Sequence, residues 1–396
     1  MTRTSTLRPR EGRASRHCPS EAEPAGSLVR GGASLVITSI FHSWEHRLAS
    51  ATKNRIVRPF DWGLDWLSLD GAAGLRGLGA GEELGSEGAT IDRYVEEVMR
   101  DTHAFFTPPP TRDFEFTPAD PGRSAGGESA TLRFPSALTT PYPENNTVAA
   151  RWFPSTAARR SGHARGPVVL VLPQWNADAG GHVGLSRLLA RCGISALRLS
   201  LPYHDVRMPA ELERADYIVS ANVVRTLQAC RQAVLDARRA VDWLSAQGFD
   251  RIGILGTSLG SCLSLLTAAH EPRIRAAALN HVSPWFADVV WHGLSTRHVR
   301  ESLDGNVSLE QLRRIWMPIS PMAYLDSMRR TRSLLVYARY DLTFPVDLSK
   351  QLLERFADHG IPHERFGLPC GHYSTGMTPF KFLDAYVLIR FLRRNL

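Results

Sequence analysis

GILGTSLGS, residues 253–261, contains the pattern Gly-x-Ser-x-Gly centred on Ser258. The apolar residues 251–256 predict a buried strand, and the sequence from Leu259 onward predicts a helix. A serine between such a strand and helix lies in a sharp, strained turn that lifts its hydroxyl clear of the sheet. The two flanking glycines leave room for the strand and the helix to approach each other. The stretch therefore predicts a nucleophilic serine.

Strand and helix patterns alternate on both sides of this turn. Further short apolar or alternating runs predict strands at residues 148–153, 167–173, 195–201, 274–280, 333–338 and 363–369. Helical patterns separate most of these runs, and this order predicts a mostly parallel sheet flanked by helices. Such sheets bind ligands at the carboxyl ends of their strands, so catalytic side chains are expected there.

Two side chains later in the chain could activate Ser258, because each directly follows a predicted strand. Asp341 follows the strand at 333–338, and His372 follows the last strand. A serine hydroxyl is a poor nucleophile unless a base takes its proton. We expect His372 to act as general base and then general acid, and Asp341 to orient the imidazole. Asp288 lies farther from the end of its strand and is the second choice for the acid.

The turn and the order Ser258, Asp341, His372 resemble the α/β-hydrolase fold over roughly residues 130–396. The resemblance implies an α/β fold whose mostly parallel central sheet is flanked by helices. It also implies a helical cap inserted between two strands, here preceded by an N-terminal helical extension.

The same resemblance implies an oxyanion hole built from two backbone N–H groups. One donor is the residue after the nucleophile, here Leu259, and the other is Trp175 or Gln174 after the strand at 167–173. Many relatives carry His-Gly after that strand, whereas this chain has Pro173 followed by glutamine. The identity of the second donor therefore stays open between the two residues.

The sequence divides into regions that differ in composition and in predicted secondary structure. Residues 1–30 contain six arginines and lack an apolar segment, which predicts a disordered tail. Residues 31–130 predict a helical and loop-rich extension, and residues 131–396 predict the hydrolase domain. Within that domain, about fifty residues at 282–331 are too long for a simple connector and predict the cap insert.

Four aromatic side chains are candidates for a substrate pocket. His204 and His281 follow predicted strands, and Trp285 and Trp291 lie in the expected cap. The functional interpretation is a pocket for an apolar acyl or alcohol group. The alternative is that the aromatic side chains of the cap only pack it onto the core.

Composition and charge exclude several classes of function. The net charge is +8, but Lys and Arg are scattered, which favours a basic surface over a nucleic-acid site. No apolar run reaches the about 18 residues of a membrane span. The five cysteines form no Cys-x-x-Cys pair, which predicts reduced thiols, a cytoplasmic location and no cysteine metal site. No histidine pair has metal-ligand spacing, so neither a metal nor a cofactor is expected.

The sequence thus predicts a carboxylesterase-like serine hydrolase that cleaves small acyl esters through an acyl-enzyme intermediate. Thioester or amide hydrolysis and acyl transfer would use the same side chains and remain alternatives. A non-catalytic binding protein on the same fold is the alternative from another class. The oligomeric state is left open.

Overall fold

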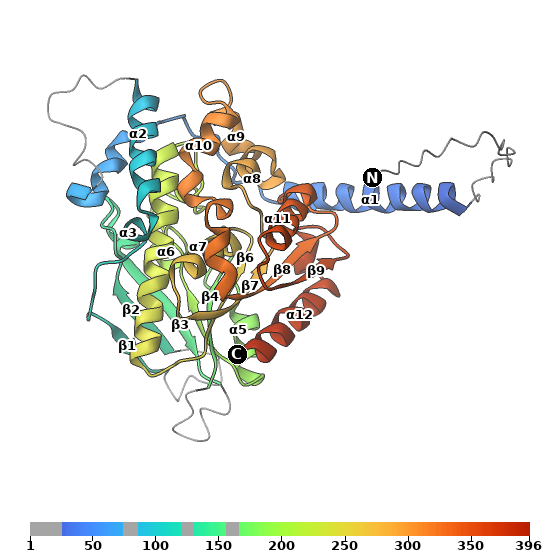
Figure 1. Ribbon diagram of the computed structural model, residues 1–396. Coiled ribbons are helices and arrows are strands. Elements are labelled where there is room, and N and C mark those ends of the chain that lie inside the picture. Colours follow the sequence, from blue (N-terminus) through green and yellow to red (C-terminus); the bar gives the residue numbers. More distant parts are fainter. Residues whose placement is uncertain (1–25, 74–85, 120–129, 156–165) are drawn as a thin grey trace, which may run out of the picture. The chain divides into compact units, whose positions relative to one another are not determined.

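A nine-stranded sheet forms the centre of the computed structural model, with helices on both of its faces (Figure 1). The structure describes residues 26–73, 86–119, 130–155 and 166–396. Residues 41–396 form one compact unit, which contains all the strands, and it is this unit that is described below.

The sheet is antiparallel at one edge and parallel elsewhere. Its strand order is β1-β2-β3-β5-β4-β6-β7-β8-β9. β1, β2, β3 and β5 pair antiparallel in succession, and the strands from β5 to β9 pair parallel. The bounds are β1 Glu115–Thr117, β2 Ala130–Pro135, β3 Thr147–Phe153, β4 Val168–Leu172, β5 Ser195–Leu199, β6 Ile252–Thr257, β7 Ile274–Asn280, β8 Arg332–Ala338 and β9 His363–Leu368. The predicted mostly parallel sheet is confirmed.

Helices of the unit 41–396 cover the sheet from both sides (Figure 1). The α-helices of the described chain are α1 Gly26–Ser50, α2 Glu87–Arg100, α3 Thr102–Phe105, α5 Val183–Arg191, α6 Val223–Ala246, α7 Leu259–His270, α8 Phe286–His292, α9 Arg297–Leu303, α10 Leu309–Ile315, α11 Val346–Asp358 and α12 Phe380–Asn395. β4 shows how two faces arise from one apolar run, because successive side chains of a strand point to opposite sides. Leu170 and Leu172 pack in the core that contains α6 and α7, whereas Val169 and Val171 pack in the core that contains α5 and α12.

Several boundaries differ from the sequence-based expectations. Residues 115–117, expected in the helical and loop-rich extension, form the edge strand β1. All three of its side chains are exposed, so no alternation of buried and exposed residues marks it. Residues 1–25 of the expected tail lie outside the described residues, and α1 begins at Gly26. The expected cap, 282–331, contains α8, α9 and α10 together with short 3-10 turns. Its role as a cap stays a prediction.

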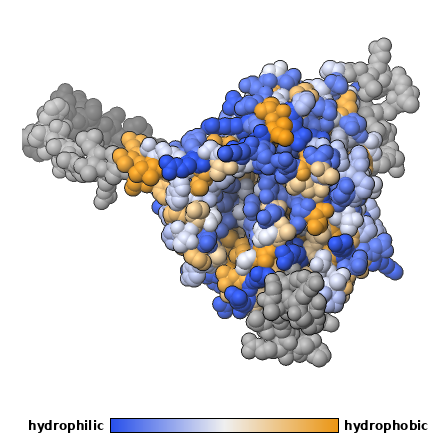
Figure 2. All heavy atoms as spheres, turned by 180° about the vertical axis from the view of Figure 1, so that it is seen from behind, coloured by the Kyte–Doolittle hydropathy of each residue, from blue (hydrophilic) through white to orange (hydrophobic). Residues whose placement is uncertain are grey.

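The part of α1 before Phe41 carries exposed apolar side chains. They are Leu35, Val36, Ile37 and Ile40, and Figure 2 shows apolar side chains on this stretch of helix. Among the described residues, no helix combines the length and the apolar character needed to cross a membrane.

Candidate active site

Ser258 occupies the turn between β6 and α7, with φ 57° and ψ −120°. This backbone conformation is strained for a residue with a Cβ, and such strain is found at functional sites. Hydrogen bonds hold the turn in place: the Ser258 N–H donates to the carbonyl of Asn280 at the end of β7 (2.8 Å), and its carbonyl accepts from the Ser261 hydroxyl (2.7 Å). The serine is therefore fixed at the carboxyl edge of the sheet, as the sequence pattern indicates.

The two glycines of the motif are required by close backbone approaches. A Cβ on Gly256 would lie 2.0 Å from the carbonyl oxygen of Gly260. A Cβ on Gly260 would lie 2.2 Å and 2.4 Å from the carbonyl oxygens of Leu172 and Pro173. The start of α7 therefore packs directly against the end of β4. This contact brings the backbone that follows Pro173 next to the nucleophile turn.

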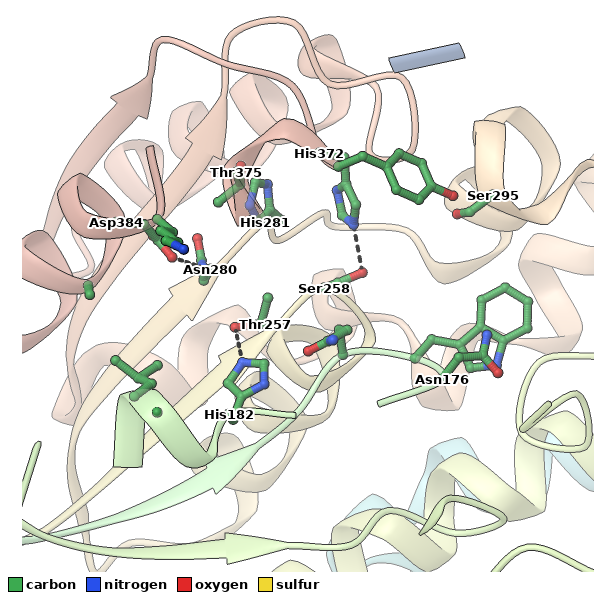
Figure 3. A pocket seen from close by; sticks show the side chains of 18 of the residues that line it. Asn176, His182, Thr257, Ser258, Asn280, His281, Ser295, His372, Thr375 and Asp384 are labelled. Atoms are coloured by element: carbon green, nitrogen blue, oxygen red, sulfur yellow. Dashed lines mark hydrogen bonds between the residues drawn. The ribbon is translucent and has the colours of Figure 1, made fainter. Parts of the chain in front are cut away.

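The structure brings Ser258, His372 and Asp341 together in one hydrogen-bonded chain. Figure 3 shows the bond between His372 and Ser258. His372 Nε2 lies 3.1 Å from Ser258 Oγ, and His372 Nδ1 lies 2.9 Å from Asp341 Oδ2. With the proton on Nδ1, the imidazole donates to the carboxylate and can accept the serine proton at Nε2. The ring of His372 also stacks on Phe344, with centroids 5.4 Å apart. The imidazole is thus held in the orientation that a general base requires.

Asp341 is fully engaged by four donors. Its Oδ1 accepts from the backbone N–H groups of Thr343 (2.8 Å) and Phe344 (2.7 Å). Its Oδ2 accepts from the Nδ1 of His372 and also from the Nδ1 of His281, at 3.1 Å. One carboxylate oxygen therefore binds two imidazoles. The backbone N–H groups bind the other oxygen and so fix the orientation of the carboxylate.

The pKa values of the cluster distinguish the two histidines. Burial alone would raise the pKa of Asp341, but its contacts with His372 and His281 hold that pKa well below the usual range. Burial opposes protonation of His372, yet the charge and hydrogen bond of Asp341 and the charge of Glu45 outweigh it and raise the pKa. Burial lowers the pKa of His281 despite its bond to the same carboxylate. A proton taken from Ser258 is therefore best held on His372.

Glu45, on α1, holds the loop that carries His372. The Glu45 side chain is fully buried, and its oxygens accept from the backbone N–H groups of Tyr373 (2.8 Å) and Ser374 (2.9 Å). A Cβ on Gly371 would lie 2.3–2.5 Å from the Glu45 side chain, so only glycine fits beside it. Sequence reasoning missed this residue, because nothing in a helical pattern identifies the distant loop that one charged side chain contacts.

A cavity of about 720 Å³ opens beside Ser258. It is lined by Thr52, Arg55, Gln174, Trp175, Asn176, His182, Gly184, Leu185, Leu188, Arg214, Thr257, Ser258, Asn280, His281, Ser295, His372, Tyr373, Thr375, Gly376, Lys381, Phe382, Asp384 and Ala385. Figure 3 shows Asn280 and Asp384 on one side of Ser258, and Asn176 and Ser295 on the other. Burial raises the pKa of Asp384 to about 7, so near neutral pH this carboxyl is partly protonated.

The expected oxyanion donors lie around the same cavity. Leu259 is the first residue of α7, so its N–H has no partner within the helix. Gln174 and Trp175 line the cavity, and within the described part of the chain their backbone N–H groups donate to no protein acceptor. Next to them, the Asn176 N–H donates to Nε2 of His204 (2.9 Å) and is not free. Their role as oxyanion donors stays a prediction.

The other predicted side chains lie in different surroundings. His281 lines the cavity, whereas His204, Trp285 and Trp291 are not among the described residues that line it. His204 is buried and holds the Asn176 loop by its hydrogen bond. Trp291 packs against the main core, which is consistent with the packing role left open for the aromatic side chains of the cap. Trp285 immediately precedes α8.

Asp288, the second candidate for the catalytic acid, is paired with an arginine in the structure. Its Oδ2 accepts from the Nε of Arg313 on α10, at 2.8 Å. The structure therefore leaves Asp341 as the carboxylate that contacts the imidazole of His372.

Among the described residues, one group has the spacing of metal ligands, namely His281, Asp341 and His372. Its separations of 2.9 and 3.1 Å between nitrogen and oxygen are those of hydrogen bonds. These contacts satisfy the carboxylate oxygen without an ion.

No protein-family model and no curated protein matches the sequence. Among solved structures, the chain resembles an acylaminoacyl peptidase from Pyrococcus horikoshii, with a TM-score of 0.54 and 14% identity over 68% of this chain and 42% of that chain. It also resembles an acetyl xylan esterase from Paenibacillus sp. R4, with a TM-score of 0.54 and 14% identity over 80% of this chain and 97% of that one. A third is acetyl xylan esterase 1 from Thermoanaerobacterium sp. JW/SL YS485, with a TM-score of 0.53 and 14% identity over 76% and 93%.

The chain spans less than half of the length of the acylaminoacyl peptidases that it matches. At these identities the likeness concerns the arrangement of the backbone. Together with the strand order and the serine turn between β6 and α7, it shows that the chain has the α/β-hydrolase fold.

Proposed function

We propose that this protein is a serine hydrolase that cleaves carboxylic esters through an acyl-enzyme intermediate. The observation that carries the proposal is the chain of hydrogen bonds from Ser258 Oγ through His372 to Asp341. A strained serine, a correctly oriented imidazole and a buried carboxylate beside a cavity are the parts that acyl transfer needs.

The reaction follows from this geometry. Ser258 Oγ attacks the ester carbonyl carbon while its proton passes to Nε2 of His372. The N–H of Leu259 and that of Gln174 or Trp175 would stabilise the negative charge on the carbonyl oxygen. Collapse of the tetrahedral species breaks the bond to the alcohol, which leaves with the proton from the imidazole. Water then repeats the sequence and releases the acid.

The solved structures that resemble this chain include both esterases and peptidases. The two acetyl xylan esterases match over 93% and 97% of their own length, whereas the peptidase matches over 42%. This difference supports ester hydrolysis over peptide hydrolysis. Thioesterase, amidase and acyltransferase activity would use the same three residues. The cytoplasmic location stays a prediction from the cysteines.

The proposal predicts covalent chemistry in the wild-type protein. With 4-nitrophenyl butyrate we expect a burst of one nitrophenol per active site followed by a slower steady state, because the acyl-enzyme accumulates. A fluorophosphonate probe should label the protein, and the matched butyryl 4-nitroanilide should react more slowly than the ester. A series of acyl lengths would then identify the preferred ester. The absence of both burst and labelling would favour the non-catalytic binding protein.

Replacement of Glu45 by glutamine should make His372 a less effective general base but leave it in the site. Glutamine keeps one acceptor oxygen for the Tyr373 and Ser374 amides but removes a charge that raises the pKa of His372. We expect kcat/KM to fall roughly 10- to 100-fold, the cost of a weakened charge-assisted bond and a displaced base. The acidic limb of the pH profile of kcat/KM should move to lower pH, because the free imidazole then loses its proton more easily.

The matched control is Glu354→Gln, an exposed glutamate on α11. It should leave both the rate and the pH profile unchanged. A Glu45→Gln enzyme with a reduced rate but an unmoved acidic limb would show that Glu45 acts only by supporting the loop.

A further inference from the structure

Two arginines line the cavity beside Trp175 and Tyr373. The guanidinium of Arg214 lies over the ring of Trp175, with Cζ 5.3 Å from the ring centre. Arg55 donates from Nη2 to the phenolic oxygen of Tyr373, at 2.9 Å, and Tyr373 directly follows the base His372. We call Arg55 and Arg214 the arginine end of the cavity.

The charges at the arginine end are not balanced by carboxylates. Asp216 is shared between Arg214 (3.4 Å) and Arg58 (3.5 Å). Among the described residues, no carboxylate lies within ion-pair distance of Arg55, and its Nε is buried without a hydrogen-bond partner. Arg214 is only 9% exposed, and its Nη2 makes no hydrogen bond within the described chain. Arg55, Arg58 and Arg214 thus have one carboxylate among them, and each has a donor without a hydrogen bond among the described residues.

His298 lies close to the same positive charges. Its ring stacks on Trp175, with centroids 5.9 Å apart, and both ring nitrogens are buried without hydrogen-bond partners. Burial and the charges of Arg214, Arg55 and Arg58 lower the pKa of His298 to about 4. The histidine is therefore uncharged at neutral pH, and its surroundings favour an anion over a further cation.

The opposite end of the cavity has a different character. Leu185 and Leu188 on α5 and Phe382 on α12 line it, together with Lys381 and Asp384. The Lys381 ammonium lies over the Phe382 ring, with Nζ 5.3 Å from the ring centre. Leu188 and Phe382 are exposed at 36% and 64%, so apolar side chains meet solvent at this mouth. An extended ligand that crosses Ser258 therefore contacts two guanidinium groups at one end. At the other end it contacts a mainly apolar surface, where Lys381 and Asp384 carry one potential charge of each sign.

We infer that the arginine end binds an anionic group of the substrate, a carboxylate or a phosphate, so that the enzyme selects acidic esters. This inference rests on the proposed ester hydrolysis. Guanidinium groups bind carboxylate and phosphate oxygens through short, charge-assisted hydrogen bonds, and these bonds are stronger where water is excluded. The apolar end receives the uncharged part of the substrate, and the ester carbonyl lies between the two ends at Ser258.

The test compares acidic esters with neutral partners of similar size. The first pair is 4-methylumbelliferyl hemiglutarate and its methyl ester, which place a carboxylate or a neutral group on the acyl side. The second is 2-(butyryloxy)ethyl phosphate and 2-hydroxyethyl butyrate, which place a phosphate or a hydroxyl on the alcohol side. We expect kcat/KM to favour the acidic member of at least one pair roughly 10- to 100-fold, the worth of one bond to a charged group.

Arg214→Gln and Arg55→Gln should each reduce this ratio towards 1, and Arg214→Lys should keep part of it. The ratio within one variant cancels any loss of folded protein. Arg329→Gln, an exposed arginine paired with Asp326, is the control and should keep the wild-type ratio. The pair that shows the preference identifies the anion. Equal rates within both pairs, or a preference that survives both glutamine variants, would overturn the inference.

A binding measurement separates this inference from the proposed function. The Ser258→Ala protein cannot form an acyl-enzyme, so titration calorimetry with the same esters measures recognition alone. Tighter binding of an acidic member, lost on adding Arg214→Gln, supports the arginine end even if the wild-type protein shows no burst. Equal Kd values for both members of each pair overturn it, even if ester hydrolysis is established.

Discussion

Ser258→Ala should lower kcat for 4-nitrophenyl butyrate by about six orders of magnitude and abolish labelling by a fluorophosphonate. Loss of the nucleophile in a serine hydrolase triad has an effect of about this size, because the covalent route disappears. The variant should still hydrolyse the ester about 10³- to 10⁴-fold faster than the uncatalysed reaction in water, since the oxyanion donors and the cavity are unchanged. Single-turnover kinetics and mass spectrometry of the labelled protein measure both effects.

The change should leave the fold intact, because among the described residues Ser258 Oγ is hydrogen-bonded only to the imidazole of His372. The matched control is Ser264→Ala on the same helix, whose buried hydroxyl has no hydrogen-bond partner. That variant should keep full activity and labelling. Labelling that persists in Ser258→Ala would remove this serine from the mechanism.

Asp341→Asn should lower kcat about 10⁴-fold while leaving KM nearly unchanged. The Thr343 and Phe344 amides donate to one carboxylate oxygen, so they will hold the single oxygen of asparagine in that place. The amide nitrogen must then face the imidazoles of His372 and His281, where two N–H donors now point. Nδ1 of His372 can accept a hydrogen bond from this amide only if the imidazole carries its proton on Nε2 instead. A protonated Nε2 cannot take the proton of Ser258.

The pH profile gives a second readout of the same change. Loss of the carboxylate removes the main charge that raises the pKa of His372, so the acidic limb of kcat/KM should move to lower pH. Asp288→Asn is the matched control, because this aspartate is bound to Arg313 instead. It should leave the activity unchanged. Equal losses in the two variants would mean that Asp341 acts only through stability.

The sheet and the convergence of three side chains were predictable because both follow from local pattern. Apolar runs of strand length show where strands lie, and parallel strands end at one edge, where Ser258, Asp341 and His372 each follow a strand. The mostly parallel sheet is confirmed, while the catalytic roles stay predictions. The sequence did not predict the strand β1, whose three residues are all exposed and show no alternation of buried and exposed side chains.

The rest of the site depends on contacts between distant segments, which pattern does not encode. Trp291 and Arg214 illustrate the difficulty, because an aromatic in the expected cap packs on the core while an unremarkable loop arginine lines the cavity. His281 follows a strand, yet only coordinates show that it shares the carboxylate of Asp341. Glu45 has no local signal at all, since its partners are two backbone amides.

The bond from Glu45 to the Tyr373 amide joins positions 328 residues apart, nearly the whole length of the chain. Closing so long a loop costs more chain entropy than forming neighbouring elements, so such contacts tend to form late in folding. We therefore expect the Ser258 turn to form before the bond from Glu45 steadies the loop that carries His372. A partly folded or still growing polypeptide that lacks this bond is therefore expected to be a weaker catalyst than the complete fold.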